Sequence, residues 1–503
     1  MRPIDRPFLK VVIPAMAGMV AARAVSVPAA MAIAGLVALF ACTVIFYRRQ
    51  QFGKAQIYLW FAVFAFFFAA GTVTHSHSTI PQGERVELVA QIVENPYQQG
   101  RWQRTTANVG YFRPAGDPDA QWTRTRERIQ LYIDTCYTVT TGRQIAFRGW
   151  LNAVDTTGSS YGRLMQLRGQ HGRLYLTPGN LIAIAPHTSR TPAYYSSRLQ
   201  NTAIERFGRL RLSPDQSGVV TAMVVGDKRG IDRDVRRSYT LSGAAHLLAV
   251  SGLHVGIVFI LINLVLYLLP VLPRGHIYKN VAAIIVVWLY AAMAGLAPSV
   301  IRAAMMASFA QVALASGTTR NALNIMLGSA VVMLALNPNW WGDPSFMLSY
   351  AAVLALSAFF WPLFRLVRSR WKLLNVFSSV MVVGLVASLG TAPLVIWWFG
   401  AFPAAGIVIN PVVMLTAHII VMFGVLWVVL PLPFLNPLFS WVLGKAAALQ
   451  NGAAEWCASM SWQSIPIELP QWGVVTIYVG YIALAVWVNR PQAKSTRPFT
   501  RLE

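Results

Sequence analysis

Charged side chains are scarce in this chain. Only 12% of its 503 residues are charged, whereas 55% are hydrophobic, and the mean hydropathy is +0.49. A soluble protein of this size carries about twice that charged fraction, roughly 25%. The composition therefore excludes an ordinary soluble domain and predicts a polytopic membrane protein.

Acidic residues are scarcer still. The chain has 18 Asp and Glu against 42 Lys and Arg, which gives a formal net charge of +24. Positively charged cytoplasmic loops explain part of this excess, but arginine is abundant outside those loops as well. The excess favours an anionic partner, and both a polyanion and anionic membrane lipid fit it.

Cysteine is rare and dispersed, at Cys42, Cys136 and Cys457. Cys136 is the only one in the large soluble insert, so that insert cannot form an internal disulfide, and no CxxC or Cys/His metal spacing occurs. We expect neither a metal site nor a cofactor. A cleavable signal pattern is also missing: a second apolar segment follows the first directly, so we interpret the first as an anchor.

Long apolar segments define the organisation of the chain. Three precede the insert, at Phe8–Val25, Val27–Tyr47 and Ile57–Val73. The positive-inside rule places the basic clusters around them in the cytoplasm, so three crossings deliver the insert to the opposite side. Later segments bring the total to about ten crossings, several of them short or interrupted by proline and glycine. These later segments are 247–269, 281–296, 298–315, 322–336, 346–366, 377–399, 404–430 and 472–488.

Between Glu84 and Pro186 the apolar runs give way to apolar and polar residues that alternate with a period of two. Examples are Val86-Leu88-Ala90-Ile92 and Ile129-Leu131-Ile133. Roughly a hundred residues of such short strands, separated by glycine and polar clusters, predict a small closed β-barrel.

The insert combines arginine with aromatic residues and contains no lysine. The aromatic residues are Tyr97, Trp102, Tyr111, Phe112, Trp122, Tyr132 and Tyr137. Arginine and aromatic side chains together hold single-stranded nucleic acid by phosphate pairing and base stacking. A solvated barrel with ordinary core aromatics fits the same pattern equally well.

A mixed polar and apolar stretch follows the insert. From Pro192 to Leu212, apolar residues such as Leu199 and Phe207 alternate with arginines such as Arg198 and Arg206. The pattern predicts an amphipathic helix that lies in the membrane interface, and a plain linker helix fits it as well.

One run in the second half combines polar residues with a membrane segment. Asp227-Lys228-Arg229-Gly230 opens a basic cluster, and an almost wholly apolar helix is predicted from Leu247 to Leu269. This helix begins beside His246 and contains Ser251, Gly252, His254 and Gly256. Ionisable groups at lipid depth usually face a protein interior or a wet cavity, and glycines let another chain approach the backbone. The run predicts a polar mouth that leads into a membrane helix.

Residues 226–235 (GDKRGIDRDV) and 241–258 (LSGAAHLLAVSGLHVGIV) closely resemble the signature of the ComEC family. Members of this family are polytopic channels that bring single-stranded DNA across the inner membrane during natural transformation. Three later segments agree with the family pattern in the same order: 297–305 (APSVIRAAM), 336–350 (LNPNWWGDPSFMLSY) and 389–394 (LGTAPL) followed by Phe399-Gly400. The N-terminal half resembles the family only in its layout.

The resemblance implies an OB-like domain in the insert and a DNA path through the second half. The residues it suggests for DNA binding or for the path are Asp227, Lys228, Arg229, His246, Ser251, Gly252, His254, Gly256, Arg302 and Ser349. The implied partners are single-stranded DNA, membrane lipids, a periplasmic DNA receptor and cytoplasmic DNA-handling proteins. Longer members add a metallo-β-lactamase-like domain, and no such sequence follows Arg490. Either the chain is a piece of a longer protein or it lacks this domain, so we expect no nuclease or other enzyme activity in it.

Isolated polar residues in the apolar segments could be catalytic, metal-binding or structural. Arg302 has no acidic neighbour within a helical turn, so a water-filled path or a phosphate partner is the favoured explanation, with snorkelling to the interface as the alternative. Asp343 is expected to cap the next helix. Ser251 and His254 are three residues apart on one helix face, where a nucleophile and its base rarely reach hydrogen-bonding distance. His246 and His254 would be about 12 Å apart on a continuous helix, too far to share a metal.

These patterns predict a polytopic α-helical membrane protein with an inserted β-barrel. The expected parts are N-terminal transmembrane helices (1–74), an extracytoplasmic OB-like domain (75–190), an amphipathic interfacial helix (191–213), a channel domain (214–490) and a basic cytoplasmic tail (491–503). We expect an inner-membrane channel for single-stranded DNA with both termini in the cytoplasm. A transporter of a smaller anion or lipid is the main alternative, and a membrane-embedded hydrolase is the third.

Overall fold

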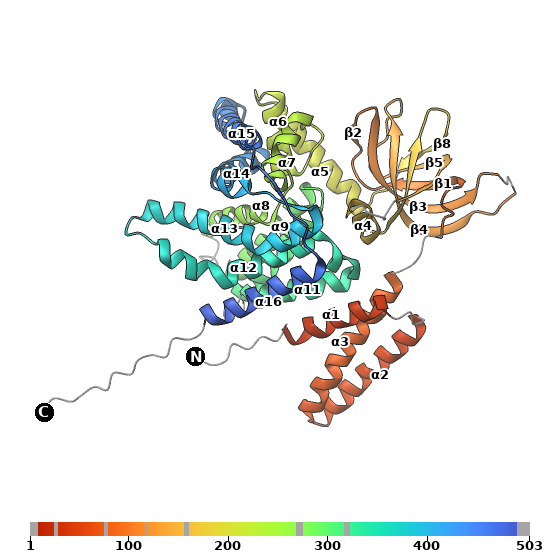
Figure 1. Ribbon diagram of the computed structural model, residues 1–503. Coiled ribbons are helices and arrows are strands. Elements are labelled where there is room, and N and C mark those ends of the chain that lie inside the picture. The colour runs from red at the N-terminus through yellow and green to blue at the C-terminus, as the bar shows by residue number, and fades with distance from the viewer. Residues whose placement is uncertain are drawn as a thin grey trace.

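The computed structural model describes residues 9–24, 29–74, 79–116, 119–154, 160–267, 275–315 and 322–489. A large helical domain lies beside a separate β domain, and the first three helices form a smaller group of their own (Figure 1). The predicted basic tail, 491–503, falls outside the described residues.

The N-terminal group consists of α1 (Leu9–Ala24), α2 (Ala29–Arg48) and α3 (Phe52–Thr74). Glycine lets α1 and α3 approach closely, because a Cβ at Gly18 would collide with the Phe64 carbonyl oxygen. Large apolar side chains on α2, such as Val37 and Phe40, are exposed, as expected for surfaces that face lipid. The three predicted apolar segments are therefore three helices.

The described part of the β domain contains eight strands. They are β1 (Arg85–Ile92), β2 (Tyr97–Gln99), β3 (Trp102–Pro114), β4 (Thr123–Asp134), β5 (Arg143–Trp150), β6 (Asn152–Ala153), β7 (Gln170–Leu176) and β8 (Leu181–Thr188). The predicted alternation is confirmed, because Val86, Leu88, Ala90 and Ile92 of β1 all point inward and are at most 1% exposed. Equivalent apolar positions of β4, β5 and β7 complete the same core.

The strands form one sheet in the order β6-β7-β4-β3-β1-β5-β8, with β2 paired to β3. The β4–β7 pair is parallel and the other pairs are antiparallel. Only Leu151 separates β5 from β6, yet β5 pairs with β1 and β6 pairs with β7. The continuous stretch formed by β5 and β6 therefore pairs with two strands, β1 and β7, that are not neighbours in the strand order.

Two helices lie between the sheet and the helical domain: α4 (Ser160–Leu167) and α5 (Pro192–Phe207) (Figure 1). The amphipathic pattern of α5 was predicted, and Ser196, Gln200, Ala203 and Phe207 form its buried face. This face packs on the helical domain: Ser196 Oγ donates to the Ala292 carbonyl oxygen (2.6 Å), and Trp427 Nε1 donates to that of Arg206 (3.2 Å). The helix therefore acts as a packed strut, and its buried face is not available to lipid.

The helical domain contains many helices of unequal length. They are α6 (Pro214–Val225), α7 (Arg233–Leu241), η1 (Ala245–Leu248), α8 (Gly252–Val265), α9 (Gly275–Met293), α10 (Pro298–Ala315), α11 (Ala322–Leu336), η3 (Pro338–Gly342), α12 (Pro344–Val367), α13 (Lys372–Phe399), α14 (Ala405–Val429), η4 (Pro433–Leu435), α15 (Asn436–Ala458) and α16 (Gln471–Val488). The short strands β9 (Ala401–Phe402) and β10 (Ile465–Pro466) pair with each other.

Five described helices are long and apolar enough to cross a membrane: α10, α12, α13, α14 and α16. Shorter apolar stretches occur at Val11–Ala22, Ile33–Arg48, Gln56–Gly71, Gly252–Val265, Ile277–Met293 and Ala322–Leu336. The chain is accordingly a helical membrane protein, while the count of about ten crossings stays a prediction.

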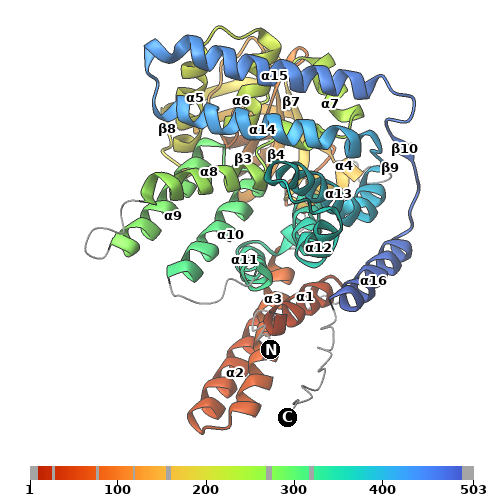
Figure 2. The ribbon, with the colours of Figure 1, turned by 90° about the vertical axis from the view of Figure 1, so that its left-hand side faces the viewer.

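The core of the helical domain is built around α14. Val413, Ala417, Ile420 and Val421 of this helix are 0% exposed, and α15 runs alongside it (Figure 2). Gly424 allows the contact between α14 and α6, since a Cβ there would collide with Val224. The segment that leads from α6 to α8 is thus anchored to the most buried helix of the domain.

The predicted continuous helix from Leu247 to Leu269 is wrong. A short 3-10 helix, η1, is followed by extended backbone at Ala249, and α8 begins only at Gly252. Ser251 is the N-cap residue of α8, and its backbone N–H donates to Nδ1 of His254 (2.9 Å). The serine and histidine that were expected inside a helix instead start one, because a side chain three residues on satisfies an N-terminal amide.

Candidate functional site

The first part of the candidate site is the loop between α6 and α7, residues 226–232, which we call the basic loop. Asp227 is buried, and its Oδ1 accepts hydrogen bonds from Nε of Arg229 (2.8 Å) and from the Arg229 backbone N–H (3.1 Å). The neighbouring Lys228 is exposed and has no ion-pair partner within the described residues. Desolvation and the positive charges of Arg236 and Arg168 lower the pKa of Lys228. Three cationic groups from three segments, Lys228, Arg236 and Arg168, therefore lie close enough to repel one another.

A cluster of arginines and aromatic residues on the β domain faces this loop. Arg104 lies over the rings of Tyr97 (5.8 Å to the centroid), Tyr132 (5.9 Å) and Tyr161 (5.5 Å). Tyr132 stacks on Tyr175 with centroids 4.7 Å apart, and Arg101 covers the ring of Trp102 at 4.7 Å. We call this set the aromatic-arginine face: Tyr97, Arg101, Trp102, Arg104, Tyr132, Tyr161 and Tyr175.

The aromatic-arginine face lies next to α7 of the helical domain. Burial raises the pKa of Tyr97, and the charges of Arg104 and of Arg236 in α7 act against that rise. A Cβ at Gly100, in the β2–β3 hairpin, would lie 3.6 Å from Nη2 of Arg233. The hairpin that carries the face is therefore next to the basic residues that follow the loop.

The other aromatic residues predicted from the insert have different positions. Phe112 belongs to the buried core, and the hydroxyl of Tyr137 accepts a hydrogen bond from the Gly179 backbone (2.9 Å). Tyr111 and Trp122 are exposed, and Arg113 lies over the ring of Trp122 at 4.9 Å. Tyr161 and Tyr175 belong to the aromatic-arginine face but were not predicted, because nothing in their local sequence distinguishes them.

The basic loop packs against the break that precedes α8. Gly226, with φ +74°, ends α6, and a Cβ there would lie 2.9 Å from the Ala294 carbonyl oxygen and 3.5 Å from Cγ2 of Val250. A left-handed backbone with so little space requires glycine. Ser299 Oγ at the start of α10 donates to the Val250 carbonyl oxygen (2.8 Å). The loop, the break and α10 therefore meet at one place.

The two histidines of the signature differ in environment. His246 is exposed, with Nδ1 3.1 Å from the Gly243 carbonyl oxygen, whereas His254 is 0% exposed. Ser251 Oγ lies 2.7 Å from Nδ1 of His254, so the expectation that these side chains do not meet is wrong. The reason is that Ser251 precedes the helix and turns back over its first turn.

This serine–histidine contact lacks the remaining parts of a hydrolytic site. Nδ1 of His254 already accepts the Ser251 backbone N–H, and Nε2 has no hydrogen-bond partner within the described residues. A catalytic base is normally oriented by a third group on its other ring nitrogen. No cluster of His, Cys, Asp and Glu able to hold a metal occurs in the described ranges. The contact is explained by capping.

The two glycines of α8 differ in how much space lies beside them. A Cβ at Gly252 would lie 3.9 Å from Cβ of Ala303 in α10, an ordinary packing contact. A Cβ at Gly256 would meet nothing within 4 Å. The structure therefore leaves open space beside Gly256, one turn into the helix.

Arg302 lies in α10 and is only 2% exposed. Its Nη2 donates to the Ser345 carbonyl oxygen (2.6 Å), to Ser345 Oγ (3.2 Å) and to Ser349 Oγ (2.9 Å). Neither snorkelling nor direct contact with a passing ligand describes this side chain, because α12 supplies its partners. Sequence reasoning missed them because they lie 43 and 47 positions away.

The same end of α12 is attached to the β domain. Asp343 caps α12 as predicted, with Oδ1 accepting from the Ser345 backbone N–H (2.8 Å), while Oδ2 pairs with Nε of Arg168 (2.9 Å). Arg168 directly follows α4, and Arg163 of α4 lies over the ring of Trp398 in α13 at 5.9 Å. A polar chain thus runs from Arg168 through Asp343 and Ser345 to Arg302.

This connection predicts a non-additive pair of substitutions. Arg168→Gln and Asp343→Asn each remove the ion pair, and asparagine still caps the helix. Each should lower the free energy of unfolding by about 1 kcal/mol, because solvent screens the partly exposed guanidinium. The double variant should melt in detergent at the temperature of either single variant. Arg173→Gln, on β7, is the control and should melt like the parent; fully additive losses would contradict the pairing.

Comparison with known proteins identifies the helical half. Residues 223–491, more than half of the chain, match the family model described as Competence protein. The chain is 33% identical over 205 residues to ComE operon protein 3 of Bacillus subtilis strain 168, a match covering 40% of this chain and 24% of that protein. It is 30% identical over 200 residues to an uncharacterized protein of Aquifex aeolicus strain VF5, a match covering 40% of this chain and 44% of that protein.

The match therefore spans about a quarter of the first relative and less than half of the second. No solved structure matches the chain significantly. The family match contains the basic loop, the break before α8, Arg302 and the capped start of α12, which are the parts that meet in the site. The chain belongs to the competence protein family.

Proposed function

We propose that this protein is a channel that carries single-stranded DNA across the membrane during natural transformation. The observation that carries the proposal is the pairing of the aromatic-arginine face with the basic loop. The rings and guanidinium groups of this face, together with Arg168 of the same domain, lie near Lys228 and Arg236 of the helical domain. Bases stack on aromatic faces of any kind, and phosphates pair with arginine and lysine without regard to sequence.

We propose further that the β domain is a closed OB-like barrel. The supporting observation is that β5 and β6, separated by one residue, pair with β1 and β7 at the two ends of the path β1-β3-β4-β7. Five strands then form a ring, as in small oligonucleotide-binding barrels. The aromatic-arginine face takes its residues mainly from β3, β4 and β7 of this ring and from β2, which pairs with β3.

The strand would leave this face, pass Lys228 and His246, and continue past the open side of Gly256. In this arrangement Asp227 and Arg229 shape the loop, Ser251 and His254 start α8, and Arg302 and Ser349 position α12 without touching the strand. A transporter for a small anion would need the arginines but would not need the five aromatic side chains gathered beside them, so the strand is the better-supported substrate.

The membrane arrangement is also proposed. The basic loops favour an arrangement with the N-terminus in the cytoplasm, the β domain outside the inner membrane and about ten crossings between the two compartments. The β domain would then receive the strand from a DNA receptor on the outer side, and cytoplasmic DNA-handling proteins would take it on emergence. We propose no catalytic step for the chain.

Cys136 tests this topology directly. It is exposed on the β domain, whereas Cys457 is buried and Cys42 is half-buried in α2. A membrane-impermeant maleimide added to intact spheroplasts should label Cys136, since the reagent reaches only the outer side. Cys457 should react only after denaturation. Labelling of Cys136 solely after lysis would invert the topology and the direction of transport.

Gly256→Leu tests the path. If the glycine borders the strand's route, leucine should reduce strand uptake by the purified protein in vesicles by about tenfold or more, while the melting temperature stays that of the parent. If the glycine instead packs on a neighbour in the membrane, leucine should destabilise the protein by about 1–3 kcal/mol.

Gly480→Leu is the matched control, because a Cβ at Gly480 in α16 also meets nothing within 4 Å. This variant should retain both melting temperature and uptake. Equal loss of uptake in the two variants, or loss of stability in Gly256→Leu, would count against the proposed route.

A further inference from the structure

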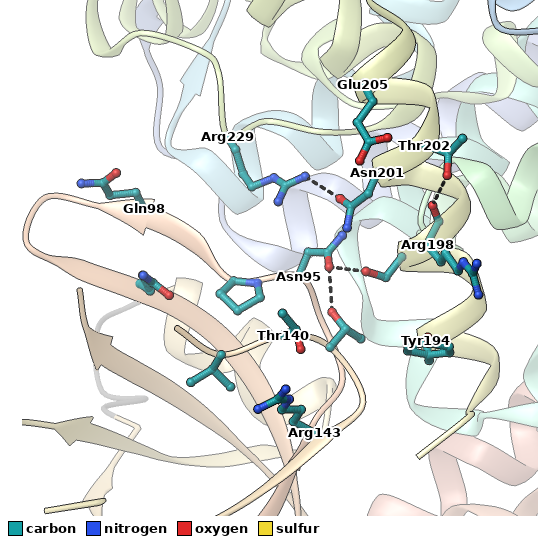
Figure 3. A pocket seen from close by; sticks show the side chains of 15 residues that line it. Asn95, Gln98, Thr140, Arg143, Tyr194, Arg198, Asn201, Thr202, Glu205 and Arg229 are labelled. Carbon is teal, nitrogen blue, oxygen red and sulfur yellow. Dashed lines mark hydrogen bonds between the residues drawn. The ribbon is translucent and has the colours of Figure 1, made fainter. Parts of the chain in front are cut away.

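A cavity lies between the β domain and α5, and Arg229 of the basic loop forms part of its wall. Its volume is about 750 Å3. The lining comes from the loop after β1, the β2–β3 hairpin, the turn before β5, one face of α5 and Arg229 of the basic loop (Figure 3). Pockets of roughly 300–1,000 Å3 are the size at which proteins enclose small ligands.

Hydrogen bonds hold the walls of this cavity in place. Asn95 Oδ1 accepts from Thr141 Oγ1 (2.7 Å) and from Ser197 Oγ (Figure 3). Asn95 Nδ2 donates to Oε1 of Gln200 (2.9 Å). Gln200 Nε2 in turn donates to the Val225 carbonyl oxygen at the end of α6 (2.6 Å). The β domain, α5 and α6 are thereby joined, so the cavity is built in advance of any ligand.

The cavity has an excess of positive charge with unused donors. Arg143, Arg198 and Arg229 line it, against a single acid, Glu205. Arg229 is already bound to Asp227 and Asn201. Nε of Arg143 is shielded from solvent and has no hydrogen-bond partner within the described residues, and Arg198 forms no ion pair within them. The net positive charge of the lining favours an anionic ligand.

The polar lining is divided along the length of α5. Arg143 lies near the Tyr194 end and Glu205 lies at the opposite end (Figure 3). Carboxamides and hydroxyls occupy the rest of the wall: Gln98, Gln103, Thr140, Asn201 and Thr202. Arginine binds phosphate, carboxamides bind the edges of bases, and the half-buried ring of Tyr194 offers a surface for stacking.

We propose that this cavity binds a nucleoside monophosphate unit, with its phosphate at Arg143 and Arg198 and its base beside Tyr194 and the carboxamides. The inference rests on the proposed function in that the transported strand is one source of the unit. A free nucleotide is the other source. Because Arg229 belongs to both the cavity wall and the basic loop, an occupied cavity lies next to the mouth of the path.

Binding of deoxyadenosine monophosphate to the purified full-length protein in detergent tests the site. Equilibrium dialysis should show saturable binding, and deoxyadenosine without phosphate should not compete. Arg143→Gln and Arg198→Gln should each weaken binding by about tenfold or more, the usual effect of removing a charged hydrogen bond. Arg126→Gln, which changes an exposed arginine of the same domain outside the lining, is the matched control and should bind like the parent.

Two results would contradict the proposed nucleotide site. One is the absence of saturable binding to the parent protein. The other is equal affinity of the parent and Arg143→Gln when their melting temperatures match. Arg143→Lys covers the case in which glutamine disturbs folding, since it keeps the charge and should retain part of the affinity. A short single-stranded oligonucleotide should displace the mononucleotide if the strand supplies the unit, and should leave it bound if free nucleotide is the ligand. Vesicle uptake measured in parallel separates the two proposals: a parent protein that transports DNA but binds no nucleotide loses only the cavity.

Discussion

The structure depends on how one buried guanidinium is held in place. Arg302 sits among apolar helices, where a charge without oxygen partners would be expensive, and it finds these partners at Ser345 and Ser349 in the first turns of α12. Asp343 caps the same turn and holds Arg168 of the β domain. A single polar chain therefore fixes α10 against α12 and attaches the β domain at that point, which places the aromatic-arginine face beside the basic loop.

The remaining geometry follows from this attachment. Gly226 brings the basic loop against the break before α8, and Ser299 ties that break to α10 one turn before Arg302. Lys228 forms no ion pair within the described residues, because the nearby carboxylate, Asp227, is bound to Arg229. The site therefore combines rigid supports, which are buried and paired, with cationic and aromatic groups that remain available. That division suits a surface that must hold a polyanion loosely enough to let it move.

The sequence predicted the features that are encoded locally. Apolar runs located the membrane helices, the period-two pattern located the core of β1 and β4, and Asp343 before proline predicted its capping role. It did not predict the break at Ala249, because the choice between continuing a helix and starting one depends on the contact between Ser251 and His254. It also missed the partners of Arg302 and the Arg168–Asp343 pair, whose members are 175 positions apart, since no local pattern records long-range pairing.

The central claim is that a strand passes between the aromatic-arginine face and the basic loop. The most direct measurement is photo-crosslinking of a labelled single strand, stalled during uptake into vesicles by a bulky end, to a benzophenone side chain placed at Tyr97, Lys228 or Trp122. Trp122 is exposed on the same domain but lies outside the face. The account predicts crosslinks from positions 97 and 228 and none from 122. Crosslinking at 122 alone, or uptake without crosslinks at 97 and 228, would contradict it.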